Sequence, residues 1–249
     1  MKPDASSQGK GIYITRKVEE IPKDKCHVVQ EYLKNPYLID GYKFDFRVYV
    51  LLVSVAPEMI CYLYSDGLGR FATEKYTKDT SGAQEGEDAM FSHLTNYSLN
   101  KNNPGADWNK YKKTLREVFL MLEKEGADVS KIYHEIRDMV VKTLISILPQ
   151  VRHMYKTCSP SQESNPKQCF EILGFDIILD KKLKPWLLEV NHAPSLNDDT
   201  ETDKKVKTQL LIDTFKLLNI KPSHRHKVMK NEKKGMQNRR PNGKTNYDA

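Results

Sequence analysis

Cysteines are few in this sequence and follow no pairing pattern. The 249 residues include four cysteines, and none of them belongs to a Cys-x-x-Cys pair. This scatter disfavours both a zinc centre and a disulfide framework, so we expect a reducing compartment.

Long apolar runs are also missing. The longest, such as residues 48–55, are far shorter than the roughly 20 residues that span a bilayer. The polar opening MKPDASSQGKG predicts no secretory signal. We therefore expect a cytoplasmic protein without a membrane partner.

Two familiar phosphate-binding motifs are absent. The sequence contains no G-x-x-x-x-G-K-[ST] and no G-x-G-x-x-G that leads into a helix. These absences exclude the P-loop and Rossmann routes to a nucleotide. No internal repeat is visible either.

The net charge of +7 is confined to one end of the chain. Residues 221–249 hold nine basic and two acidic side chains, whereas the other 220 residues hold 31 of each sign. This basic tail is poor in apolar residues, so we expect it to be disordered, or helical only when bound. It is either a solvated tail or a contact for a polyanion. RNA or DNA would fit the charge, but Tyr247 is its only aromatic residue, and nucleic acid is the less favoured partner.

Hydrophobic periodicity predicts alternating strands and helices. Strands are predicted at 12–15, 28–33, 43–55 and 59–64, with a turn at 65–69. Helices are predicted from Trp108 to just before Gly126, from the cap Asp128 to the stop at Pro149, and over 204–218. Antiparallel pairs dominate, so the fold class is α+β, or mixed α/β, and not a doubly wound sheet.

The stretch 174–191 predicts a hairpin with an acidic face. If its turn is centred between Lys182 and Leu183, Asp176 lies directly opposite Glu189, and Asn191 points to the same face. Opposed carboxylates destabilise a sheet unless a positive group lies between them. Such oxygen donors suit Mg²⁺ with a nucleotide. Taken alone, the pair could equally be two strand residues that face solvent.

The strand predicted at 43–55 begins in strict alternation. Lys43, Asp45 and Arg47 share one face, and the residues between them are apolar. The charged triplet is either a solvated edge or the wall of a charged cleft.

Four segments, in this order, carry a family resemblance: KFDFRVYV, HLTNYSLNK, GFDIILD and WLLEVNHAPSL. Together with the polar clusters around them, they resemble the tubulin tyrosine ligase-like family, over residues 2 to about 220. The resemblance implies an ATP-grasp-like fold with antiparallel sheets and flanking helices, of which the N-terminal part is missing here. We expect a partial catalytic domain at 1–220 and the basic tail at 221–249.

The resemblance also implies roles for individual residues. Residues similar to the family's ATP contacts are Lys2, Gln8, Gly9, Lys10, Gly11, Gln30, Glu31, Tyr32, Leu33, Lys43, Asp45, Thr95 and Asn96. The implied Mg²⁺ ligands are Asp176, Glu189 and Asn191. Residues similar to those that hold the free amino acid are Arg70, Tyr97, His192 and Lys207. The implied catalytic residues are Arg47, Arg70 and Glu189. A further lysine contact, Lys110 or Lys112, stays unplaced.

The implied activity is an ATP-dependent ligase that adds glutamate to glutamate side chains of tubulin tails through an acyl phosphate. The implied partners are microtubules and free L-glutamate. The basic segment would contact the acidic tails of tubulin on the microtubule. The implied location is the cytoplasmic cytoskeleton, or more narrowly a cilium or basal body. HAPS after Asn191 and the basic tail resemble polyglutamylases. The alternatives are a catalytically incomplete microtubule-binding fragment, or a relative that uses glycine or a non-tubulin acidic protein.

Overall fold

The computed structural model describes residues 1–3, 11–15, 17–23, 26–78, 91–95, 108–158 and 169–219. It divides into two compact units, Met1–Leu210 and Leu211–Ala249. The boundary between them lies inside the last helix, and the domain limits expected from the sequence stay a prediction. The basic tail lies outside the described residues.

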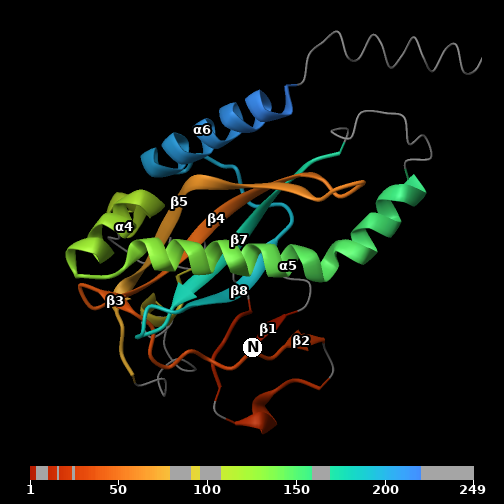
Figure 1. The fold of residues 1–249 in the computed structure, drawn as a ribbon. Helices are drawn as coiled ribbons and strands as arrows, with labels where there is room; N and C mark the ends of the chain where they lie inside the picture. Colours follow the sequence, from red (N-terminus) through yellow and green to blue (C-terminus); the bar gives the residue numbers. More distant parts are fainter. Residues whose placement is uncertain are drawn as a thin grey trace, which may run out of the picture. The chain divides into compact units, whose positions relative to one another are not determined.

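The described elements alternate in type along the chain, as Figure 1 shows by colour. In order they are β1 (Lys2–Pro3), the 3-10 helix η1 (Val18–Glu20), β2 (His27–Val28), β3 (Leu38–Ile39), β4 (Tyr42–Ser54), β5 (Ile60–Lys75), α3 (Trp108–Tyr111), β6 (Lys112–Thr114), α4 (Leu115–Lys124), α5 (Val129–Cys158), β7 (Glu171–Leu179), β8 (Pro185–Asn191) and α6 (Glu201–Leu218). None of the described helices is long and apolar enough to cross a membrane.

A six-stranded antiparallel sheet forms the centre of the first unit. Its order is β6-β5-β4-β7-β8, and β3 pairs with β4 as well. β1 and β2 form a separate two-stranded ribbon. The mixed α+β class predicted from the sequence is confirmed.

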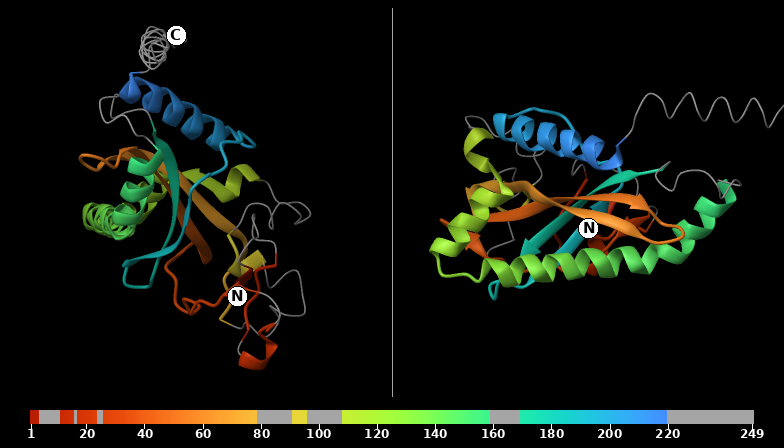
Figure 2. Two further views of the ribbon diagram at one scale, coloured as in Figure 1. Left: turned by 90° about the vertical axis from the view of Figure 1, so that its right-hand side faces the viewer. Right: turned by 45° about the horizontal axis from the view of Figure 1, so that its top comes forward.

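The two faces of this sheet have different surroundings. Alternate residues of β4, among them Phe44, Phe46 and Val48, pack into one apolar core with α4 and α5, which lie on one side of the sheet in Figure 2. On the opposite face, Tyr49 and Leu68 pack against the first half of α6. The charged triplet of β4 lies on this second face of a central strand and is not a solvated edge, and two of its members, Lys43 and Asp45, line a cleft.

The turn predicted at 65–69 is wrong, because β5 runs through it. Gly67 and Gly69 are strand residues at places of close approach: a Cβ on Gly67 would meet the backbone oxygen of Arg47 at 2.5 Å, and one on Gly69 would overlap Val118 of α4. Glycine here makes room for a neighbour and does not reverse the chain.

The helix predicted from Trp108 to Gly126 is interrupted. The chain forms α3, then the edge strand β6, then α4, which the capping box of Thr114 and Glu117 starts afresh. The large residues keep a helical spacing across the break, so the sequence pattern predicted a single helix. The predicted end does hold, since Gly126 adopts a φ of +86°.

Pro149 does not stop α5, which continues to Cys158. The cap at Asp128 is confirmed by its side chain, which accepts a hydrogen bond from the Lys131 amide at 2.9 Å. Proline removes one backbone donor and can kink a helix instead of ending it. Figure 1 shows α5 changing direction in its C-terminal part.

Two short strands predicted near the N-terminus are also wrong. Residues 12–15 form no strand, and of 28–33 only Val28 belongs to one. Residues of both segments line the cavity at the polar face of the sheet.

The close approach at Gly67 yields a test of the fold. We expect Gly67→Ala to lower the free energy of unfolding by about 1–3 kcal/mol, because the added methyl group overlaps a backbone carbonyl that cannot rotate away. The matched control, Ser65→Ala at an exposed position of the same strand, should change it by less than about 0.5 kcal/mol. Urea unfolding followed by circular dichroism measures both. Equal stabilities for the two variants would contradict the account.

Candidate functional site

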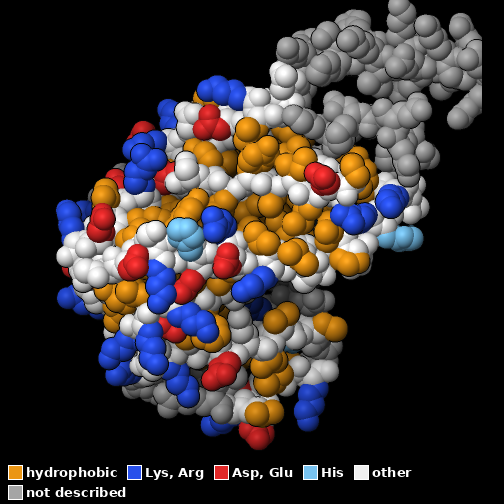
Figure 3. Space-filling model, in the orientation of Figure 1, with side chains coloured by type: hydrophobic (Ala, Val, Ile, Leu, Met, Phe, Trp, Pro, Cys, Tyr) orange, Lys and Arg blue, Asp and Glu red, His pale blue; other side chains and the backbone are white. Residues whose placement is uncertain are grey.

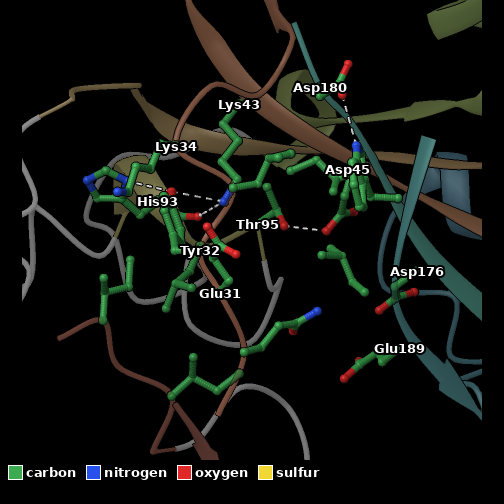
Figure 4. Close-up of a pocket in the computed structure, with 18 of the residues that line it drawn as sticks. Glu31, Tyr32, Lys34, Lys43, Asp45, His93, Thr95, Asp176, Asp180 and Glu189 are labelled. Atoms are coloured by element: carbon green, nitrogen blue, oxygen red, sulfur yellow. Dashed lines mark hydrogen bonds between the residues drawn. The ribbon is translucent and has the colours of Figure 1, made fainter. Parts of the chain in front are cut away.

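A cavity of about 840 Å³ opens over the polar face of the sheet. Its volume lies within the roughly 300–1,000 Å³ usual for small-molecule sites. Eleven residues singled out from the sequence line it: Lys2, Gln30, Glu31, Tyr32, Leu33, Lys43, Asp45, Arg70, Thr95, Asp176 and Glu189. Figure 4 shows several of them pointing into it from separate segments.

The other residues singled out from the sequence are not among the cavity's lining residues. Gly11, Arg47, Asn191, His192 and Lys207 are described but do not line the cavity, and Gly11 and His192 are exposed. Gln8, Gly9, Lys10, Asn96 and Tyr97 lie outside the described residues. Their expected contacts to ATP or to the amino acid stay predictions.

One row of charged residues crosses three strands. Arg47 of β4 is paired with Asp176 of β7, which is paired in turn with Glu189 of β8. The predicted opposition of the two carboxylates is confirmed. The turn is centred at Lys182, half a residue from the assumed position, and a bulge at Leu188 restores the pairing.

Asp176 accepts hydrogen bonds from two arginines at once. Arg47 donates through Nε to Oδ1 and through its terminal nitrogen to Oδ2 at 2.9 Å, and Arg70 lies 3.0 Å from Oδ2. Burial alone would raise the pKa of Asp176, but Arg70 and Arg47 hold that pKa well below its usual range. Asp176 therefore stays ionised at neutral pH.

Arg70 connects this carboxylate to a second one. Its Nε donates to Oδ1 of Asp45 at 2.6 Å, and the hydroxyl of Thr95 donates to the other oxygen of Asp45. Burial alone would lower the pKa of Arg70, but Asp176 and Asp45 raise it. The result is a continuous network of alternating charges on β4, β5 and β7.

Glu189 has polar contacts at each of its oxygens. Lys2 lies 3.2 Å from Oε2, and the side-chain amide of Asn191 contacts Oε1 and the Gly174 carbonyl, both at 3.4 Å. Asn191 thus lies on the same face as Glu189, as predicted. Sequence reasoning placed Lys2 near phosphate, and here its partner is the carboxylate.

The donor chemistry of this row fits Mg²⁺. Asp176, Glu189 and Asn191 offer only oxygen ligands, and Mg²⁺ commonly uses one or two carboxylates together with substrate phosphates. The described residues contain no cluster of three or more His, Cys, Asp and Glu side chains suited to a metal. The two carboxylates form ion pairs with Arg47, Arg70 and Lys2.

A second polar cluster lies at the other end of the cavity. Lys43 donates to the His93 carbonyl at 2.6 Å and to the Tyr32 hydroxyl at 3.2 Å, and that hydroxyl lies 2.9 Å from His93 Nδ1. Figure 4 shows the three side chains together. His93 has a structural hydrogen-bonding role here. Burial lowers the pKa of Lys43 to about 8.

Lys207 points to a buried aspartate and not into the cavity. Asp203 lies 2.7 Å from Lys207 and 2.5 Å from Lys112 of β6. The sequence left Lys110 and Lys112 as alternatives; the structure exposes Lys110 and buries Lys112 beside Lys207. The sequence did not predict the position of Lys112 because its segment was assigned to a helix. In the structure this segment is a strand, which places Lys112 directly opposite Arg70 of β5.

Comparison with known proteins gives the family of the chain. The profile described as "Tubulin-tyrosine ligase family" matches residues 1–228. The chain belongs to the tubulin-tyrosine ligase family. The family is one of ligases, and its fold is ATP-grasp-like, in agreement with the α+β sheet.

Curated relatives of this family are similar over most of the chain. "Probable beta-tubulin polyglutamylase" of Tetrahymena thermophila is 45% identical over 98% of the chain and 21% of its own length. Human "Tubulin polyglutamylase TTLL6" is 45% identical over 93% of the chain and 26% of its own length. "Tubulin polyglutamylase TTLL7" of Xenopus tropicalis is 42% identical over 96% and 26%. The chain thus spans about a quarter of the length of these relatives.

The lowered pKa of Lys43 predicts how stability changes with pH. Below pH 8 the folded state carries the full cost of burying the charged amine. Between pH 8 and 10.5 the folded lysine loses its proton and the unfolded one keeps it, so the free energy of unfolding should rise, by up to about 3 kcal/mol. Tyr32 does not oppose this rise below pH 10, because burial raises its pKa.

Urea unfolding of the wild-type chain and of Lys43→Met at pH 7, 8.5 and 9.5 measures this rise. The pKa of Lys112 is also lowered by burial. The difference in slope between the two proteins therefore gives the part of the rise in unfolding free energy that comes from Lys43. A slope that is the same in both proteins would contradict the prediction.

Proposed function

We propose that this chain holds the nucleotide, metal and amino-acid sites of an ATP-dependent ligase that adds glutamate to glutamate side chains of tubulin tails. One observation carries the proposal: Asp176 and Glu189 lie side by side in the wall of the cavity, together with the cations Lys2 and Arg70, and Arg47 pairs with Asp176 from behind that wall's lining. The printed names of the relatives, tubulin polyglutamylases, supply the substrate class.

The cavity offers a place for ATP along its length. Gln30 to Leu33 would hold adenine at one end, and Lys43 and Thr95 would contact the nucleotide beside them. Lys2, with Gln8, Gly9, Lys10 and Gly11, would approach the phosphates, as the family resemblance implies. Asp176, Glu189 and Asn191 would hold Mg²⁺, which when bound neutralises phosphate charge.

The reaction needs positioning and cations more than a covalent nucleophile. A side-chain carboxylate of the protein substrate attacks the γ-phosphorus, its bond to the ADP oxygen breaks, and an acyl phosphate forms. The neutral amine of free glutamate then attacks the acyl carbon, phosphate leaves with the bonding pair, and the nitrogen gives up a proton. Arg47 and Arg70 would stabilise charge that develops on the phosphoryl oxygens.

The amino acid would lie near Arg70, the cation that contacts both Asp45 and Asp176 in the cavity. Lys207 would contact it too, and His192 and Tyr97 are candidates from the resemblance alone. A free glutamate carries two carboxylates, so closely placed arginine and lysine suit it better than a substrate without side-chain charge, such as glycine.

A second function follows from the charge of residues 221–249. Their net charge of +7 suits an acidic microtubule surface, and the chain would then bind microtubules through this tail without catalysis. On either function we expect the chain at the cytoplasmic cytoskeleton, with cilium or basal body as narrower candidates.

Incorporation of labelled glutamate separates these functions. The purified chain is incubated with microtubules, ATP, Mg²⁺ and labelled glutamate, and protein-bound label is measured. We expect incorporation that falls at least about 100-fold in Glu189→Gln, since removing one well-placed charge contact in a transition state costs about 3 kcal/mol. Glu123→Gln, at an exposed position of α4, should keep full activity.

Glycine in place of glutamate tests the amino-acid preference in the same assay.

If no labelled glutamate is incorporated and the chain still co-sediments with microtubules in a salt-sensitive way, the binding function replaces the ligase function for this chain. Equal activity of wild type and Glu189→Gln would show that the acidic pair does not hold the metal.

A further inference from the structure

Asp203 is a fully buried carboxylate, with 0% of its surface exposed, and lies in the first turn of α6. Two ammonium groups contact it: Lys112 Nζ lies 2.5 Å from Oδ2, and Lys207 Nζ lies 2.7 Å from Oδ1. Burial alone would raise the pKa of Asp203, but hydrogen bonds from Lys112 and Lys207 lower it. Both lysines are buried as well.

Thr200 fixes the position of this carboxylate. Its hydroxyl donates to Asp203 Oδ2 at 2.8 Å and accepts from the Asp203 amide at 3.1 Å. This is the reciprocal geometry of a helix N-cap, so Asp203 is held before any substrate arrives. Thr202 adds a bond from the same helix turn to the Lys112 carbonyl, at 3.3 Å.

The cluster lies beside the cation that faces the cavity. Lys112 of β6 is directly opposite Arg70 of β5, and Arg70 is opposite Asp45 of β4. Directly paired residues share a face of the sheet, with Cβ atoms about 4.5–5.5 Å apart. Two adjacent cations repel, and here each has its own carboxylate: Arg70 has Asp45 and Asp176, and Lys112 has Asp203.

Tyr49 contributes a polar group near the cluster of Lys112, Lys207 and Asp203. It is fully buried, packs with Val206 of α6, and its hydroxyl has no hydrogen-bond partner among the described residues. A buried donor without a partner costs about 1–3 kcal/mol unless a ligand supplies one. The three charged groups of the cluster sum to one positive charge, and Asp199 also acts electrostatically on Lys112. A spare hydroxyl donor beside two lysines favours a bound anion.

We propose that Asp203 is the positioning residue that holds Lys112 and Lys207 beside Arg70, so that these cations select a free amino acid with two carboxylates. This role rests on the proposed function and deepens it, because it explains why a dicarboxylic amino acid is preferred. Asp203 itself does not touch the substrate. It sets the spacing of lysines that come from β6 and α6, two elements that lie far apart in the chain.

A purely structural role makes a different prediction. If Asp203 only ties α6 to the edge strand, its loss lowers stability and leaves the affinity for the amino acid unchanged. If it positions the lysines, affinity for glutamate falls while affinity for the nucleotide does not, because Asp203, Lys112 and Lys207 are not among the residues that line the cavity proposed for ATP.

Calorimetry on the full 249-residue chain distinguishes the two roles. L-glutamate is titrated into protein saturated with Mg²⁺ and a non-hydrolysable ATP analogue. We expect Asp203→Asn to weaken glutamate binding about tenfold or more, and to change the dissociation constant of the analogue less than about twofold. Asp213→Asn, an exposed aspartate of α6 paired with Lys216, is the matched control and should bind as wild type does.

A milder variant keeps the test decisive if Asp203→Asn fails to fold. Thr200→Val removes both hydrogen bonds between the Thr200 hydroxyl and Asp203 and should weaken glutamate binding about threefold or more with the analogue unaffected. Unchanged glutamate affinity in a folded variant, with a lower urea midpoint, overturns the positioning role and leaves the proposed function intact. Absence of glutamate binding by the wild-type chain overturns the proposed function, and the positioning role with it.

Discussion

The bidentate contact of Arg47 with Asp176, extended by Arg70, is the interaction on which the rest of the site depends. It connects β4, β5 and β7 at the middle of the sheet, in a buried position where an unpaired charge would cost several kcal/mol. Because Asp176 is buried and the two arginines are only slightly exposed, removing one partner would leave the others poorly compensated. The same contact gives Asp176 the ionised form that a metal ligand requires.

On the polar face of the sheet, positive and negative side chains pair with one another. Three carboxylates (Asp45, Asp176 and Glu189) meet three cations (Lys2, Arg47 and Arg70). On the proposed function, ATP with Mg²⁺ would offer each group an alternative partner of the same sign, since the metal would replace cations at the carboxylates and phosphates would replace carboxylates at the cations. The protein therefore holds a polar cavity at little net charge and loses little when it exchanges those contacts.

Sequence reasoning was strongest where the side-chain pattern itself specifies the neighbour. Asp176 could be placed opposite Glu189 because both runs of the hairpin are apolar and the turn is short, and the bulge at Leu188 compensated for a misplaced turn centre. It was weakest where the cause was a distant contact. Gly67 serves the close approach of Arg47, and Lys112 belongs to a strand only because β5 lies beside it. Neither neighbour is visible in a local window of sequence.

The central claim is that this face binds Mg²⁺ and ATP together through Asp176. Calorimetric titration of ATP into the chain, with Mg²⁺ and then with EDTA, tests it most directly when repeated on Asp176→Asn. The account predicts that Mg²⁺ strengthens ATP binding to the wild-type chain at least about tenfold and that this gain disappears in the variant. ATP affinity that is independent of Mg²⁺, or a gain that the variant keeps, would contradict it.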